Sequence, residues 1–72
     1  MTALRTDPDL QQRIVRLLEV QPLLTSREIA AQLDAPIRDV TWEIVIMVHR
    51  RRLAFDGQPP ARYRLTDDEA TR

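Results

Sequence analysis

The sequence of 72 residues lacks cysteine and lysine, and it holds one glycine, one histidine and three aromatic residues. Without cysteine the chain has no disulfide framework, no thiolate zinc site and no cysteine nucleophile. A single histidine cannot supply the usual ligand set of a zinc site. The longest apolar run, residues 44–48, is far too short to span a bilayer, and residues 1–5 carry no apolar signal segment. The composition therefore predicts a cytoplasmic protein with no metal, no cofactor and no membrane partner.

The length and the apolar content bound the size of the fold. A chain of 72 residues is one domain at most, and 43% hydrophobic residues suffice for a small core. A core of this size is marginal, so a homodimer or a protein partner would help to complete it. We expect one domain over residues 1–66 and a polar C-terminal tail over residues 67–72.

The charges are balanced overall but unevenly distributed. The sequence contains eleven arginines and eleven acidic residues, and this balance argues against nucleic-acid binding by bulk charge alone. Residues 49–64 hold five arginines and only Asp56, a net charge of +4. The segments on either side, residues 1–48 and 65–72, each have a net charge of −2. The sequence thus contains one distinctly basic segment.

Capping and turn residues divide the first half into two helices. Residues 6–9 combine a capping residue, a proline suited to a first turn and acids near the positive end of a helix dipole, which predicts a helix ending near Val20. Thr25 and Glu28 have the spacing of a capping box, which predicts a second, short helix. Residues 34–36 form a tight turn, so the spacing is that of a helix-turn-helix.

The segment from Ile37 to Arg51 fits two structures. Its β-branched and aromatic residues alternate, as in a strand, but they also follow helical spacing. Its length and the preceding turn favour a helix. The expected core side of this helix centres on Val40, Ile44 and Met47. The opposite side collects Arg38, Trp42, Ile46 and His49, with Val45 beside them.

The last part of the chain predicts a β-hairpin. Residues 53–55 and 62–65 alternate around a loop at 56–61 that contains two prolines. The side chains expected to face the core are Leu53, Phe55, Tyr63 and Leu65. Those expected to face outward are Arg62 and Arg64.

Two segments and four apolar residues are similar to those of a known family. The segments are residues 25–33 (TSREIAAQL) and 62–66 (RYRLT), and the apolar residues are Val40, Ile44, Val48 and Leu53. With the order of elements, they make residues 7–66 resemble the winged helix-turn-helix family, in the form of bacterial and phage transcription regulators. The resemblance implies a mostly α fold with a small β-hairpin, in which three helices are followed by a two-stranded wing.

The same resemblance implies a small DNA-binding protein that regulates transcription, with double-stranded DNA as its partner. The helix over residues 36–51 would read the major groove, and the wing would contact phosphates or the minor groove. Structural roles also fit some of the arginines, since cations stabilise helix C-termini and discourage aggregation at sheet edges. The implied DNA-contacting residues are Arg38, Thr41, Trp42, Arg50, Arg51, Arg52, Gln58, Arg62 and Arg64.

A second hypothesis is a protein–protein interaction module, an adaptor or inhibitor that docks through the Trp42/Ile46 face. Trp42, Val45 and Ile46 would form an apolar stripe, which is more typical of a protein interface than of a surface for phosphates. Both hypotheses allow a homodimer. Catalysis has little support, because His49 stands alone beside three arginines and the acids at 67–69 lie in the expected tail. We expect no enzymatic activity and no catalytic residue.

Overall fold

The computed structural model describes residues 6–57 and 59–66; Gln58 and the expected tail at 67–72 lie outside the described residues. The ambiguous third segment is a helix, and the predicted hairpin is present. The elements of the described residues are α1 (Pro8–Val20), β1 (Leu24–Thr25), α2 (Ser26–Leu33), α3 (Ile37–His49), β2 (Leu53–Phe55) and β3 (Arg62–Leu65).

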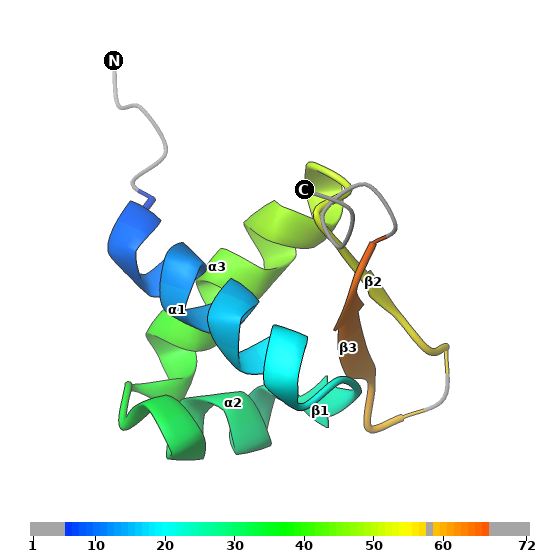
Figure 1. Ribbon diagram of the computed structural model, residues 1–72, viewed down its shortest axis with the longest axis horizontal. Helices are drawn as coiled ribbons and strands as arrows, with labels where there is room; N and C mark the ends of the chain where they lie inside the picture. The colour runs from blue at the N-terminus through cyan, green and yellow to red at the C-terminus, as the bar shows by residue number, and fades with distance from the viewer. Residues whose placement is uncertain (1–5, 58, 67–72) are drawn as a thin grey trace.

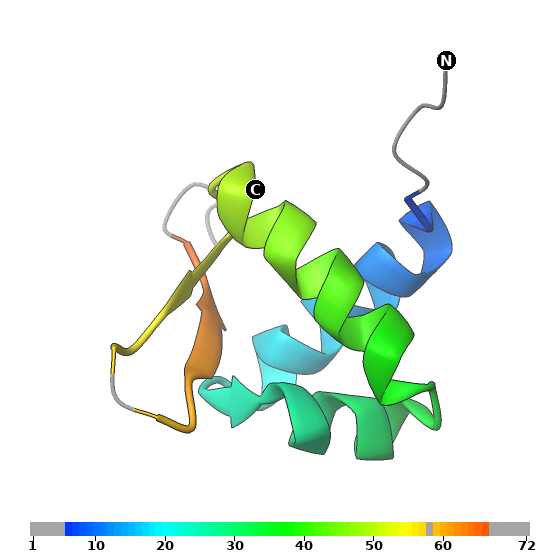
Figure 2. The same ribbon diagram turned by 180° about the vertical axis from the view of Figure 1, so that it is seen from behind.

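The helices pack together with the small sheet at one side. In Figure 1, α1 crosses in front of α3, and α2 lies below both. The antiparallel sheet has the strand order β1-β3-β2 and stands beside the C-terminal end of α1. In the reverse view of Figure 2, α3 crosses the front of the molecule, and no other element lies in front of it.

α1 begins where the capping residues predict. The side chain of Asp7 accepts a hydrogen bond from the backbone N–H of Leu10 at 3.1 Å, and Pro8 occupies the first turn. At the other end, the side chains of Gln21 and Gln32 exchange two hydrogen bonds of 2.8 and 2.9 Å. This amide pair joins the end of α1 to α2.

The predicted capping box opens α2. The Thr25 hydroxyl accepts from the backbone N–H of Glu28 at 3.1 Å, and the Glu28 carboxylate accepts from the N–H of Thr25 at 2.9 Å. The C-cap of α2 is Asp34, which has the left-handed φ of 53° that aspartate tolerates better than most residues. The Arg13 guanidinium donates to the carbonyl of Leu33 at 2.6 Å, so α1 also satisfies the end of α2.

The sheet contains one strand that the sequence did not reveal. β1 pairs with β3, with Leu24 opposite Tyr63, and β2 pairs with the other side of β3, with Phe55 opposite the same Tyr63. The expectation that Phe55 faces the core is wrong, because its side chain is 53% exposed and its ring lies 6.1 Å from that of Tyr63. Leu53 is 2% exposed, so the hairpin leaves the helical core between these two residues.

The core joins all three helices to the base of the hairpin. Ile14 of α1, Ile29 of α2 and Met47 of α3 are fully buried, and they belong to one cluster with Leu53. Burial of a large apolar side chain stabilises a fold by about 1.5–3 kcal/mol. The expected core side of α3 is confirmed, since Val40, Ile44 and Met47 are all buried.

The start of α2 responds to acid through Glu28. Hydrogen bonds from the backbone N–H and the hydroxyl of Thr25 lower the pKa of Glu28, and the positive charge of Arg62 adds to this, while desolvation opposes it. Because the pKa is lower in the folded chain, the carboxylate stabilises the fold at neutral pH. This contribution is lost as the pH falls through the folded pKa.

We therefore expect Glu28→Gln to be less stable than the wild type at pH 7, and the gap to close as the pH falls below about 4. Thermal unfolding midpoints of both proteins across the acid range measure the gap. A gap that stays constant over this range would contradict a stabilising role of the charged carboxylate.

Candidate nucleic-acid interface

One side of α3 faces solvent. Arg38, Thr41, Val45 and His49 follow one another at steps of three or four residues, and all four are exposed. Trp42 lies beside them and is 44% exposed. These five residues are called the α3 face below. They belong to the second helix of the helix-turn-helix that α2 and α3 form.

Ile46 is not part of the α3 face, and its expected outward position is wrong. Its side chain is only 7% exposed. On a helix Ile46 lies about 60° from Glu43, and Glu43 is buried where it contacts α1. The buried arc of α3 is therefore wider toward α1 than its apolar pattern indicated. The predicted Trp42/Ile46 face reduces to Trp42 and Val45.

A chain of hydrogen bonds fixes α3 against α1 and the base of the wing. The buried carboxylate of Glu43 accepts from the backbone N–H of Asp7 at 3.1 Å and from the side-chain amide of Gln11 at 2.8 Å. The amide oxygen of Gln11 accepts from the guanidinium of Arg52 at 2.9 Å. Gln11 thus links a buried carboxylate to an arginine. Within residues 6–57 and 59–66, every buried side-chain nitrogen and oxygen has a partner.

Sequence reasoning missed Gln11 and Glu43, although both carry a signal. Gln11 lies three residues before Ile14, and Glu43 lies three residues after Val40, so both occupy positions that the helical period assigns to the core. A polar residue at a core position in each of two helices indicates a buried polar pair. Predicting that Gln11 and Glu43 form such a pair also requires knowing that α1 and α3 pack together.

Arg52 differs from Arg50 and Arg51, with which the sequence groups it. Its side chain is half-buried and donates to Gln11. Its backbone carbonyl accepts from the N–H and the hydroxyl of Thr66, at 3.2 and 3.3 Å. These hydrogen bonds hold Arg52 against α1 and the end of β3. We infer that Arg52 has a structural role at the base of the wing, and its expected DNA contact stays a prediction.

Glu43→Gln should lower the free energy of unfolding by about 1–3 kcal/mol, because the new NH2 group would face a donor and leave a buried N–H unpaired. Urea unfolding with an unchanged slope measures the loss. Glu19→Gln, which changes an exposed carboxylate of α1, is the control and should stay within about 0.5 kcal/mol of the wild type. Similar losses in the two variants would show that the buried chain does not stabilise the fold.

The C-terminus of α3 ends in a Schellman motif with arginine where glycine is usual. The N–H of Arg51 donates to the carbonyl of Val48 at 3.0 Å, and the N–H of Arg52 donates to that of Met47 at 2.8 Å. Arg51 has the left-handed φ of 61°, which costs a residue other than glycine about 1 kcal/mol. Arg50 and Arg51 are both exposed. The end of the helix therefore presents two cations to solvent.

The wing presents two further cations. Arg62 and Arg64 are exposed on β3, as the alternation predicts, while Tyr63 and Leu65 pack against the core. Arg62 is near enough to Glu28 to help lower the pKa of that carboxyl, so part of its charge is balanced within the protein.

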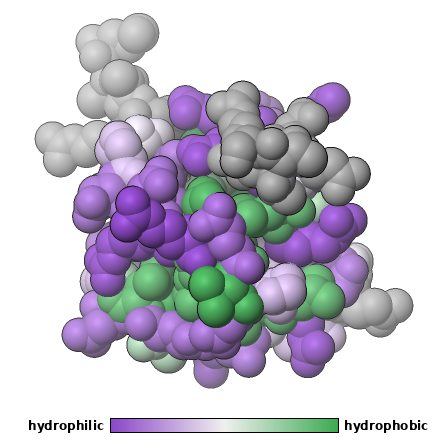
Figure 3. Space-filling view, viewed as in Figure 1, coloured by the Kyte–Doolittle hydropathy of each residue, from purple (hydrophilic) through white to green (hydrophobic). Residues whose placement is uncertain are grey.

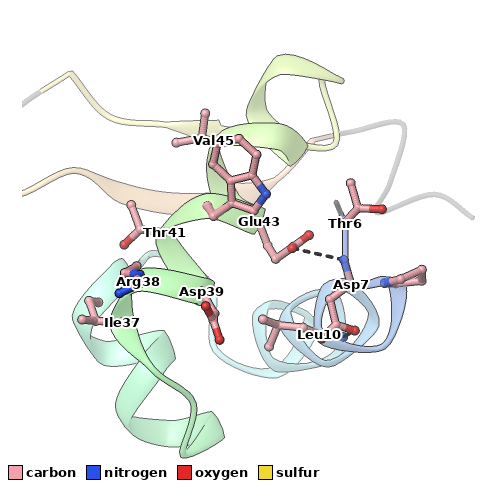
Figure 4. Close-up of a pocket in the computed structure, with 11 residues that line it drawn as sticks. Thr6, Asp7, Leu10, Ile37, Arg38, Asp39, Thr41, Glu43 and Val45 are labelled. Atoms are coloured by element: carbon pink, nitrogen blue, oxygen red, sulfur yellow. Dashed lines mark hydrogen bonds between the residues drawn. The ribbon is translucent and has the colours of Figure 1, made fainter. Parts of the chain in front are cut away.

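A groove of about 880 Å³ separates the start of α1 from the N-terminal half of α3. Figure 4 shows Asp39 between the two walls and Arg38 at the far side from α1. The side of the groove nearest α1 is therefore acidic, and a cation stands at the opposite side. The groove is lined by Thr6, Asp7, Pro8, Leu10, Ile37, Arg38, Asp39, Thr41, Trp42, Glu43 and Val45.

The face of the molecule that carries α1 has fewer features of a binding site than the α3 face. It is mostly hydrophilic, with dispersed apolar patches (Figure 3), and Val20 and Leu23 are exposed at the end of α1 and in the turn after it. Isolated apolar residues of this kind are normal on a protein surface. In the described part of the chain, no group of histidine and acidic residues could hold a metal ion. No helix there is long and apolar enough to cross a membrane.

Two solved structures, both variants of ZitR from Lactococcus lactis, resemble this chain with a TM-score of 0.79 and 17% sequence identity each. The match covers 99% of this chain and 50% of ZitR, so the chain spans about half the length of that protein. No protein-family model matches the chain, and no curated protein sequence does. The structural likeness shows the fold, which is the expected winged helix-turn-helix with three helices and a wing.

Proposed function

We propose that the protein is a small winged-helix regulator of transcription that binds duplex DNA by placing the α3 face in the major groove. The observation that carries the proposal is that α3 leaves one whole side exposed, with Arg38 at its start and Arg50 and Arg51 just past its end. The second helix of a helix-turn-helix enters the groove with its N-terminal residues at the base edges. Arg38 and Thr41 then reach bases, and Arg50 and Arg51 reach phosphates.

The charges around the α3 face support one orientation of the duplex. Asp7 and Asp39 border the face on the side of α1, where they repel phosphates. Arg62 and Arg64 supply cations on the wing. The DNA backbone therefore runs past the wing and the C-terminal end of α3. This segregation lets a chain with no net charge bind a polyanion.

The wing can be tested by the salt dependence of binding. Each phosphate contact that is lost should reduce the slope of log affinity against log salt by about 0.9, so Arg62→Ala and Arg64→Ala should each lower the slope by this amount. Fluorescence anisotropy of a labelled mixed-sequence duplex, titrated at low and physiological salt, measures it. Arg16→Ala, an exposed arginine of α1, is the matched control and should leave the slope unchanged. Unchanged slopes in both wing variants would remove the wing from the proposed interface.

A substitution at Arg51 should change DNA affinity and folding stability in opposite directions. Arg51→Gly should raise the free energy of unfolding by about 0.5–1 kcal/mol, because glycine adopts the left-handed conformation without strain. The same variant should bind duplex DNA more weakly at every sequence, since a phosphate contact is lost. Arg50→Gly removes the same charge from a residue with φ of −86° and should lose both stability and affinity. If Arg51→Gly binds DNA as tightly as the wild type, Arg51 does not contact phosphate.

A second candidate function is docking of a protein on the same face. It is favoured by the exposure of Val45 (55%) and Trp42 (44%), which are apolar, and of the neighbouring Ile37 (45%). Binding of this kind would depend little on salt and would be lost on Trp42→Ala. Absence of DNA binding even at low salt would favour this candidate over the first.

A further inference from the structure

The α3 face is polar at its two ends and apolar in its centre. Arg38 lies in the first turn of α3, and His49 is its last residue. Between them Thr41, Trp42 and Val45 are exposed, and Val45 is the most exposed apolar residue of the helix, at 55%. The face is about 16 Å long at 1.5 Å per residue, the length of about five base pairs.

The major groove offers only one apolar group to such a surface. Guanine, cytosine and adenine present hydrogen-bond donors and acceptors at their edges, whereas thymine adds a C5 methyl group. An apolar side chain placed over a cytosine or guanine edge would remove water from polar atoms without replacing their hydrogen bonds. Placed over a thymine methyl, it buries apolar surface on both sides. The same side chains therefore both favour thymine and disfavour G·C pairs.

We infer that the centre of the α3 face reads thymine methyl groups, so that the preferred duplex is A·T-rich opposite Thr41, Trp42 and Val45. Arg38 then contacts a base pair at one end of this stretch, where a guanine offers it two acceptors. The inference rests on the proposed function and names the class of DNA that the site selects.

The surroundings of the apolar centre fit duplex DNA better than a protein. Exposed arginines follow it at the end of α3 (Arg50, Arg51) and stand on the wing (Arg62, Arg64). A rim with cations from two separate elements complements the DNA backbone that runs past the wing and the end of α3. The apolar centre complements the methyl groups at the floor of the groove. One occupant thus accounts for both parts of the surface.

The test compares two labelled duplexes of the same A·T-rich sequence, one with thymidine and one with deoxyuridine throughout. Deoxyuridine pairs with adenine in the same way and lacks only the methyl group. The wild-type protein should bind the deoxyuridine duplex about fourfold more weakly for each methyl that it contacts, measured by anisotropy at low salt. Val45→Ala should bring the ratio of the two affinities closer to one. Val20→Ala, an exposed valine of α1, is the matched control and should keep the wild-type ratio.

Three results would overturn the inference. Equal affinity of the wild type for both duplexes, with binding that is sensitive to salt, removes the methyl contacts and leaves the proposed function intact. A thymine preference that survives in a triple variant, Thr41→Ala with Trp42→Ala and Val45→Ala, places the methyl contacts outside the α3 face. Absence of binding to either duplex at low salt overturns the proposed function together with the inference. Circular dichroism of the variants verifies that they are folded.

Discussion

The hydrogen-bonded chain from Glu43 through Gln11 to Arg52 is the constraint on which the rest of the arrangement depends. It joins the middle of α3 to the start of α1 and to the first residues of the wing. A buried polar group is costly when its partner is lost, so only a narrow range of rotations of α3 satisfies the chain. The rotation that buries Glu43 also points the α3 face outward. The polar interior thereby sets both which side of α3 is exposed and where the wing begins.

The three consecutive arginines after α3 differ in where their side chains lie. Arg52 turns inward and holds the wing, while Arg50 and Arg51 stay exposed. Arg51 does so in a left-handed conformation that glycine would adopt without strain. Local strain of this kind gathers where a side chain serves a purpose other than stability. In the proposed complex that purpose is contact with phosphate, and the surrounding Schellman hydrogen bonds hold the strained residue in place.

Local signals in the sequence were enough to predict most of the fold, because helix caps and hairpin turns act within a few residues. The capping by Asp7 and the capping box of Thr25 and Glu28 are present as expected. The missed features depend on distant contacts. β1 has two residues and exists through its pairing with β3. Arg52 is placed by its hydrogen bond to Gln11 of α1, and the pattern of a single element does not show this contact. The DNA contacts of the α3 face and the wing stay predictions.

In the proposed complex, affinity and selectivity belong to different parts of the surface. Contacts of arginine with phosphate are the same at every sequence and weaken as salt rises. Because acids elsewhere in the chain balance its arginines, the long-range electrostatic attraction between the protein and DNA is small. The apolar centre at Trp42 and Val45 adds contacts whose strength depends little on salt. These contacts are favourable only with some base pairs. In a winged helix with no net charge, base contacts therefore supply a larger share of the binding free energy than in a basic one. The exposed apolar centre of the α3 face then favours selected sites over other DNA.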